Sequence, residues 1–187
     1  MSFIADIDAS WSLFLDRDGV INERIVGGYV QNCSSFHLLD GVADAIAVFK
    51  KRFGRIFVVT NQQGIGKKIM TTRDLQRIHN YMENELSIAF DGIYHSPYLA
   101  EENNMMRKPN PGMALEAKKN FPEIDFKKSV MIGDSASDIQ FGKNLQMKTV
   151  YISSQNADTD ADVVCKSLYD FAEMVVEEKI LRLKRYL

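Results

Sequence analysis

The stretch Leu13-Phe-Leu-Asp-Arg-Asp-Gly-Val-Ile21 is an apolar run that ends in two acids and a glycine. Its first three residues, with Trp11 before them, have the uninterrupted apolar character of a short strand buried on both faces of a parallel sheet. Asp16 and Asp18 follow at the carboxyl end of that strand, which is the edge where open α/β sheets bind ligands. Side chains two residues apart point to the same side of an extended chain, so we expect the two carboxylates to lie together.

Two neighbouring carboxylates repel each other unless a cation lies between them. Mg²⁺ prefers oxygen ligands and needs only one or two carboxylates, because it keeps several of its water molecules. Asp16 and Asp18 are therefore compatible with a magnesium site. They are equally compatible with a strand that runs into an ordinary Asp-Gly turn.

The composition is typical of a soluble globular protein. A chain of 187 residues can bury most of its apolar side chains in one core, so we expect residues 1–187 to form a single domain. Hydrophobic residues make up 45% of the chain and charged residues 26%. The 23 basic and 25 acidic residues give a net charge of -2, which does not favour binding to a nucleic-acid backbone.

The cysteines and the apolar runs favour a cytoplasmic location. Cys33 and Cys165 lie far apart and form no paired motif, so neither a disulfide framework nor a cysteine-rich metal site is indicated. The N-terminus lacks a basic segment followed by an apolar core, and no apolar run approaches the ~20 residues of a membrane helix. We expect a cytoplasmic protein that binds no membrane, and its oligomeric state is not indicated by any pattern in the sequence.

Apolar runs of strand length alternate with amphipathic stretches of helical length. The expected strands cover residues 13–15, 55–59, 93–95, 129–132 and 148–152, with a short edge strand at 163–164. The expected helices cover residues 42–53, about 72–89, 111–119, a short segment before 148, and about 167–183. This alternation predicts an α/β fold with a doubly wound, mostly parallel, Rossmann-like sheet. Residues 22–37 are polar and contain Gly27-Gly28, which indicates a flap beside the two acids.

Four strand-end segments should bring polar side chains to one edge of this sheet: Asp16/Asp18, Thr60/Asn61, Lys108 and Asp134/Asp138. A carboxylate nucleophile can divide phosphate-ester hydrolysis into two steps through an aspartyl-phosphate, while a second acid protonates the leaving oxygen and then activates water. We assign these roles to Asp16 and Asp18. The Thr60 hydroxyl, the Lys108 ammonium and Mg²⁺ suit the remaining work of charge stabilisation, and Asp134 would complete the metal site.

Each of these residues also has a structural interpretation. Thr60 could cap a helix, Lys108 could be a solvated surface lysine, and Asp134 with Asp138 could stabilise a helix N-terminus. Their joint occurrence, each beside an expected strand end, favours a phosphoryl-transfer site.

These motifs resemble those of the haloacid dehalogenase superfamily: Asp-x-Asp-Gly, Thr-Asn after the second strand, a lysine, and Gly-Asp-x-x-x-Asp. Within it, four stretches are similar to the D,D-heptose 1,7-bisphosphate phosphatase and histidinol-phosphatase branch, namely residues 15–22, 28–30, 60–66 and 107–113. The resemblance extends from about Leu13 to Ile152. It implies a Rossmann-like sheet without a large cap domain and a Mg²⁺-dependent phosphomonoesterase that acts on a small phosphorylated molecule.

The resemblance also implies roles for individual residues. The metal would be held by Asp16, the main-chain carbonyl of Asp18, and Asp134. The substrate phosphate would contact Thr60, Asn61 and Lys108, and the sugar or a second phosphate would lie near Arg107, Gln62 and Gln63. Asp138 would orient Asp134 or Lys108, and the flap, which includes Asn22 and Arg24, would partly cover the site.

One segment departs from the pattern of this branch. Many members carry a Cys-x-His and Cys-x-Cys zinc loop before Arg-Lys-Pro, and the matching positions here are Ser96, Tyr98, Asn104 and Met106. None of them is a thiolate, and a lone histidine such as His95 is more often packed or exposed than a ligand. We therefore expect no structural zinc.

The charged residues near the site help to distinguish between candidate substrates. Arg24 and Arg107 could bind a second phosphate, which favours a heptose 1,7-bisphosphate, whereas the amine of histidinol phosphate would prefer acids near the flap such as Glu23. A receiver-type signalling domain also combines Asp, Thr, Lys and Mg²⁺, but its phosphoacceptor follows the third strand, where residues 93–95 offer no aspartate. A non-catalytic phosphosugar-binding protein is disfavoured because Asp16 and Asp18 are both present.

Overall fold

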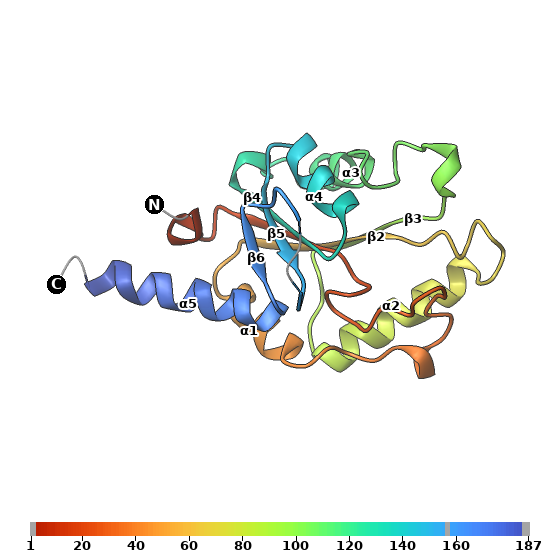
Figure 1. Ribbon diagram of the computed structural model, residues 1–187, viewed down its shortest axis with the longest axis horizontal. Coiled ribbons are helices and arrows are strands. Elements are labelled where there is room, and N and C mark those ends of the chain that lie inside the picture. The colour runs from red at the N-terminus through yellow and green to blue at the C-terminus, as the bar shows by residue number, and fades with distance from the viewer. Residues whose placement is uncertain (1–2, 156–157, 185–187) are drawn as a thin grey trace.

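The computed structural model describes residues 3–155 and 158–184 (Figure 1). Within this part of the chain, six strands form one parallel sheet in the order β3-β2-β1-β4-β5-β6. The strands are β1 Ser12–Leu15, β2 Arg55–Asn61, β3 Gly92–Ser96, β4 Ser129–Gly133, β5 Lys148–Ile152 and β6 Val163–Cys165. All six expected strands are present, and the prediction of a doubly wound, Rossmann-like α/β fold is confirmed.

Helices cover both faces of the sheet. They are α1 Val42–Lys50, α2 Thr72–Leu86, α3 Gly112–Asn120, α4 Ala136–Asn144 and α5 Leu168–Lys184. Two core clusters separate these helices: α1, α2 and α5 pack on one face, and α3 and α4 pack on the other (Figure 1). The strand ends carry no large cap domain in the described part of the chain, as expected.

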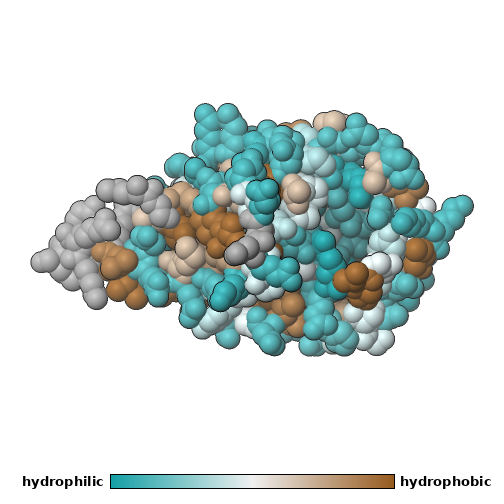
Figure 2. Space-filling model, in the orientation of Figure 1, coloured by the Kyte–Doolittle hydropathy of each residue, from teal (hydrophilic) through white to brown (hydrophobic). Residues whose placement is uncertain are grey.

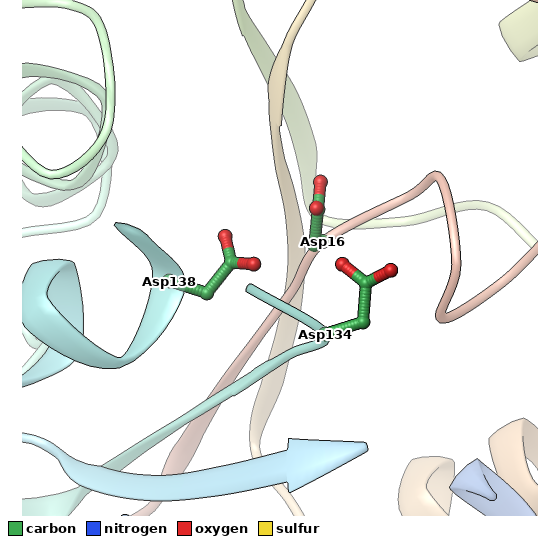
Figure 3. A group of neighbouring side chains, drawn as sticks. All are labelled: Asp16, Asp134 and Asp138. Atoms are coloured by element: carbon green, nitrogen blue, oxygen red, sulfur yellow. The ribbon is translucent and has the colours of Figure 1, made fainter. Parts of the chain in front are cut away.

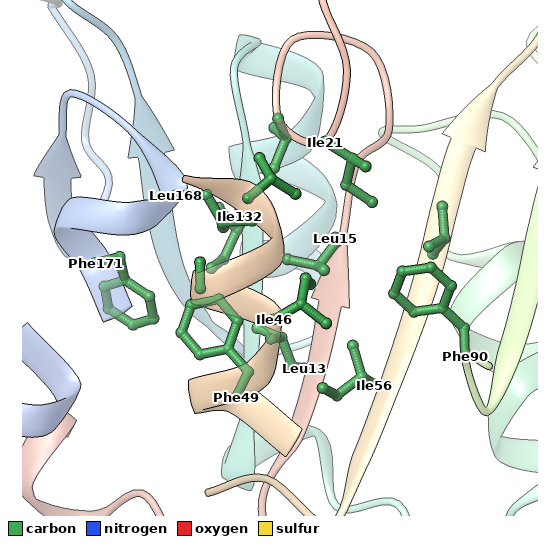
Figure 4. Packing of buried hydrophobic residues seen from close by; sticks show 14 of the residues in the cluster. Leu13, Leu15, Ile21, Ile46, Phe49, Ile56, Phe90, Ile132, Leu168 and Phe171 are labelled. Atoms are coloured by element: carbon green, nitrogen blue, oxygen red, sulfur yellow. The ribbon is translucent and has the colours of Figure 1, made fainter. Parts of the chain in front are cut away.

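Strand β1 shows how the sequence alternation builds these two cores. Leu13 and Leu15 pack with α1 residues such as Ile46 and with Ile132 of β4 (Figure 4). Phe14, between them, packs on the opposite face against Phe57, with ring centroids 5.0 Å apart. Every residue of β1 is buried, and the three that follow Ser12 form an uninterrupted apolar run, as expected for a strand covered on both faces.

The segment between β1 and α1 is a long loop, as the expected flap requires. Isolated bridges join Asn22 to Asp18 and to Leu38, so the base of the loop is held to the end of β1. The loop contains a short 3-10 helix at Cys33–Ser35, and the side chain of Val26 is 93% exposed. The flap is therefore anchored at its base and projects into solvent.

Two helices end earlier than their apolar patterns predict. Helix α1 ends at Lys50, and Phe53 is buried in the turn that follows it. Helix α2 begins at the expected position, after a capping box between Thr71 and Asp74, but Ser87 adopts a left-handed conformation (φ 51°) that ends it. Ala89, expected on its apolar face, is exposed beyond the helix.

The molecular surface is mostly hydrophilic on the face shown in Figure 2, with apolar residues gathered along α5. Exposed apolar side chains of β6 and α5 include Val164, Val176, Ile180 and Leu181. Among the described residues, no helix has the length and apolarity that crossing a membrane requires.

Candidate active site

The carboxyl ends of β1 and β4 bring three carboxylates together. Asp16 follows β1, Asp134 follows β4, and Asp138 lies in the first turn of α4 (Figure 3). One oxygen from each carboxylate lies within 4.8 Å of the other two. The sequence prediction that these strand ends meet at one edge is correct, and such an oxygen-only cluster could hold a hard divalent cation.

Lys108 is buried among these acids and is not a surface lysine. Its Nζ lies 2.9 Å from Oδ1 of Asp16 and 2.7 Å from Oδ1 of Asp138, and it donates a hydrogen bond to the Val59 carbonyl. Burial alone would lower the pKa of Lys108, but the charges of Asp138 and Asp16 outweigh burial and raise it. Lys108 is therefore a fixed cation between two carboxylates.

Asn61 holds the main chain of Lys108. Its Oδ1 accepts from the Lys108 amide at 3.0 Å, and its Nδ2 donates to the Lys108 carbonyl at 3.1 Å. The resemblance implied a phosphate contact for Asn61. In the structure its side chain ties the end of β2 to the loop that carries Lys108.

Asp16 and Asp134 hold protons more tightly than free aspartates do. Burial raises the pKa of Asp16 to about 7, and the charges of Asp138 and Asp18 add to this while Lys108 opposes it. Burial likewise raises the pKa of Asp134 to about 6, against the opposing charge of Arg24. The site thus contains more negative charge than Lys108 neutralises, which favours a further cation.

One guanidinium nitrogen of Arg24 lies against the oxygens expected to bind the metal. Nη2 is 2.6 Å from Oδ1 of Asp134, 3.3 Å from the Asp18 carbonyl, and 3.9 Å from Oδ2 of Asp16. This donor set fits a hard divalent cation, because its three oxygens already surround a positive charge. The sequence analysis predicts Arg24 as a substrate-binding residue. In the structure its guanidinium contacts the acids of the expected metal site.

Gly19 allows Asp134 to approach the turn after β1. Gly19 has φ +89°, and a Cβ atom built on it would lie 1.8 Å from Oδ2 of Asp134. Only glycine fits this position, both for its conformation and for the space.

Asp138 joins the site to the start of α4. Its Oδ2 accepts hydrogen bonds from the main-chain amide and the hydroxyl of Ser135 in a capping box, while its Oδ1 faces Lys108. The two interpretations of Asp138, as a helix-stabilising acid and as a residue that orients Lys108, therefore apply to the same side chain.

The carboxylate of Asp18 is held by three donating side chains. Arg17 binds both of its carboxylate oxygens, Asn22 donates to Oδ1 at 3.0 Å, and Gln62 donates to Oδ2 at 2.8 Å. Burial would raise the pKa of Asp18, but the charge of Arg17 and these hydrogen bonds lower it overall. Gln62 also donates to the Thr60 hydroxyl at 2.8 Å, so it links the second acid to the end of β2.

Two adjoining cavities lie over these residues. The smaller, about 250 Å³, is lined by the catalytic candidates and by Arg107, Ser135 and Ser137. The larger, about 420 Å³, lies between the flap and the loop after β2, and Tyr29, Gln62 and Lys67 are among its lining residues. Both cavities are bordered by the same four residues: Asp18, Arg24, Asn61 and Gln63.

Sequence reasoning missed several residues around these cavities. Ser135 and Ser137 lie between the two acids of a motif, and that position could have indicated them. Lys67 and Tyr29 are neighbours only in space, with Nζ of Lys67 5.5 Å from the centre of the Tyr29 ring. Arg17 stands between Asp16 and Asp18, directly after an apolar strand, and a cation at that position could have indicated a buried ion pair.

The chain matches a known protein family over most of its length. The family model described as polynucleotide kinase 3 phosphatase matches residues 14–174. The chain belongs to this family. Curated relatives of this family member include two bacterial enzymes. The D-glycero-alpha-D-manno-heptose-1,7-bisphosphate 7-phosphatase of Mycobacterium bovis is 35% identical over 88% of this chain and 91% of its own length. The beta-anomer 7-phosphatase of Escherichia coli K12 is 33% identical over 90% and 95%.

Solved structures agree with this assignment. The D,D-heptose 1,7-bisphosphate phosphatase of B. bronchiseptica, complexed with magnesium and phosphate, matches with a TM-score of 0.81 and 25% identity, over 90% of this chain and 99% of that one. The Burkholderia thailandensis enzyme of the same name shares the fold, with a TM-score of 0.64 and 22% identity over 89% and 98%. The resemblance to the haloacid dehalogenase superfamily and its heptose-bisphosphate phosphatase branch is confirmed.

Proposed function

We propose that this family member is a Mg²⁺-dependent phosphomonoesterase that hydrolyses the 7-phosphate of D-glycero-D-manno-heptose 1,7-bisphosphate. The observation that carries the proposal is that Asp16, Asp18, Thr60 and Lys108 line one cavity of about 250 Å³. This cavity adjoins a larger one whose lining includes the cations Arg24 and Lys67, where a second phosphate could lie. The names of the curated relatives support the same substrate.

In the first step, a carboxylate oxygen of Asp16 attacks phosphorus, and the bond from phosphorus to the sugar oxygen breaks. Asp18 gives its proton to that leaving oxygen. Its pKa is low in the ligand-free site, and the negative charge of a bound phosphate would raise it and so supply the protonated form. Lys108 holds Asp16 in place through its 2.9 Å ion pair.

In the second step, Asp18 takes a proton from a water molecule, which attacks the phosphorus of the aspartyl-phosphate. The bond from phosphorus to Asp16 breaks, inorganic phosphate leaves, and both acids return to their starting state. The Thr60 hydroxyl and nearby main-chain amides can donate hydrogen bonds to the phosphoryl oxygens.

Asp16, the Asp18 carbonyl and Asp134 would hold Mg²⁺, with Asp138 orienting Lys108. When bound, the ion supplies positive charge that neutralises the phosphoryl oxygens and keeps the carboxylates ionised. Arg24, which now faces these oxygens, would then be free to turn towards the flap cavity.

A screen of phosphate release tests this function. Purified protein with Mg²⁺ is offered both anomers of the heptose bisphosphate, histidinol phosphate and nucleoside monophosphates, ranked by kcat/KM. We expect a heptose bisphosphate to rank first, EDTA to stop turnover, and Mg²⁺ to restore it. Asp16→Asn should abolish phosphate release with the fold intact. If the Asp16→Asn variant hydrolysed substrate at the wild-type rate, the mechanism would be disproved.

The prediction that the loop of residues 96–106 binds no zinc also stays with this proposal. Ser96, Tyr98, Asn104 and Met106 offer no thiolate, and a metal analysis of the purified protein would test it.

A further inference from the structure

The side chain of Arg17 is completely buried, although it lies in sequence between the two acids of the site. Its Nη2 donates to Oδ1 and Oδ2 of Asp18 at 2.8 and 2.9 Å, and its Nε lies 3.3 Å from Oδ1. Removing a guanidinium from water is costly unless a carboxylate of good geometry compensates it. Arg17 and Asp18 therefore fix each other's orientation.

The far side of the guanidinium is held by α2. Nε2 of His79 lies 3.4 Å from Nη1 of Arg17, and His79 is buried beside His95, with ring centroids 6.4 Å apart. Burial, the charge of Arg17 and the proximity of His95 lower the pKa of His79 to about 3. The neutral imidazole can thus accept a hydrogen bond from Arg17.

Asp18 borders both cavities of the site, whereas Arg17 is absent from the lining of either. A bound substrate would meet the carboxylate of Asp18 and not the guanidinium behind it. A chain of contacts therefore runs from His79 through Arg17 to Asp18, and it ends where the leaving oxygen of a phosphate ester would lie.

We propose that Arg17 is a positioning residue that acts through Asp18: it holds the carboxylate from behind, in the orientation from which Asp18 exchanges protons with the leaving group and with water. This inference rests on the proposed phosphatase reaction. It predicts that Arg17 matters for proton transfer and hardly for the binding of phosphate.

The test uses two classes of substrate and the variant Arg17→Lys. Lysine keeps the charge but cannot reproduce the two-point bond of a guanidinium to a carboxylate. An alkyl phosphate needs a proton on its leaving oxygen, so its kcat/KM should fall by about 10²-fold, the range typical of general acid catalysis. The leaving group of p-nitrophenyl phosphate needs no proton, so we expect its kcat/KM to change by less than about threefold.

A second measurement reports on the hydrolysis of the aspartyl-phosphate. With p-nitrophenyl phosphate, the variant should accumulate phosphorylated Asp16, because Asp18 is also the base that activates water. Acid-quenched intact-protein mass spectrometry of enzyme at steady state would detect this as a larger phosphorylated fraction than in the wild type.

Arg55→Lys is the matched control. Arg55 also pairs with carboxylates, Asp91 at 2.8 Å and Glu123 at 3.0 Å, but it lies at the beginning of β2, away from the site. This substitution should leave both kcat/KM values unchanged. If Arg17→Lys does not fold, His79→Phe carries the test, since it removes the contact behind the guanidinium and should affect the alkyl substrate more.

Equal losses on the two substrates, or no loss on either, would overturn the role of Arg17. Failure of the wild-type protein to hydrolyse any phosphate ester would instead disprove the proposed function. The wild-type assay therefore separates the two failures.

Discussion

The acids at the end of the sheet bind protons as well as cations, and this gives the protein a predictable dependence on pH. The folded-state pKa is about 7 for Asp16 and about 6 for Asp134, both above the ordinary value of 3.8. Between about pH 4 and 7 the folded chain binds more protons at these groups than the unfolded chain, so their contribution to the free energy of unfolding falls as pH rises.

In the proposed metal site Mg²⁺ would bind the ionised carboxylates, so it should stabilise the protein more at pH 8 than at pH 5. One pKa unit corresponds to ~1.4 kcal/mol, and ~1 kcal/mol moves the Tm of a domain of this size by about 2–4 °C. We therefore expect a Mg²⁺-induced Tm increase of several degrees at pH 8 and little at pH 5. Differential scanning fluorimetry with Mg²⁺ or EDTA measures it, and equal increases at the two pH values would contradict the account.

The energetic coupling between Lys108 and Asp138 can be measured. Lys108→Met leaves Asp16 and Asp138 buried without their cation, which should cost roughly 3–5 kcal/mol of the free energy of unfolding. Adding Asp138→Asn removes one of the unpaired charges, so the double variant should be more stable than Lys108→Met alone. Urea denaturation of the two single variants and the double variant gives the coupling free energy between the two residues. Strictly additive changes in the free energy of unfolding would refute the coupling.

At this scale, sequence patterns located the acids and Lys108 but not all of their partners. Asp16 and Asp134 were predictable because each directly follows an apolar strand. A phosphate contact of Asn61 stays a prediction, but its bonds to the main chain of Lys108, which join residues 47 positions apart, were not expected. No local pattern encodes such a contact, because it depends on how separate loops meet.

At the scale of elements, the turn after β1 is a tightly constrained connection to the site. Gly19→Ala would place a Cβ atom 1.8 Å from Oδ2 of Asp134 and would also strain a backbone with φ +89°. We expect Mg²⁺ affinity, measured by isothermal titration calorimetry, to fall at least about tenfold, as changes that disturb the orientation of metal ligands commonly do.

Gly27→Ala is the control for this substitution. Gly27 also has a positive φ, +71°, but a Cβ atom there would meet nothing within 4 Å. It should therefore show the backbone strain without the loss of metal affinity. Equal losses in both variants would show that strain, and not the contact with Asp134, weakens the site.

The elements themselves were largely predictable, and their ends were less so. Strands β1, β2, β4 and β5 contain apolar runs of three or more residues, and the buried positions of α2 repeat at helical spacing. The end of α2 depends on the left-handed conformation of Ser87. A serine in the sequence does not indicate that its backbone will adopt this conformation. Ala89 consequently fitted the apolar pattern and still lies outside the helix.

At the scale of the whole molecule, the two core clusters share the strands between them. Leu13 and Leu15 belong to one cluster and Phe14 to the other, so neither core can separate without breaking β1. We propose that the chain is a single cooperative domain. Calorimetry should show one transition with equal van't Hoff and calorimetric enthalpies, and two transitions would contradict this proposal.

The order of the strands could not be predicted from their patterns. Apolar runs of similar length and composition give no preference for which strand pairs with which. The pairing of β1 with both β2 and β4 brings three of the site's segments together, and this arrangement emerges only when the whole sheet forms.

The position of β1 also has a consequence for motion. All four of its residues pair with a strand on each side, so its amides should be among the slowest to exchange with solvent deuterium, whereas those at the exposed tip of the flap should exchange quickly. We therefore expect Asp16 to belong to the part of the molecule that opens least often, and the flap tip around Val26 to open more often. Under the proposed mechanism, substrate would enter and product would leave through fluctuations of the flap while Asp16, the proposed nucleophile, keeps its place.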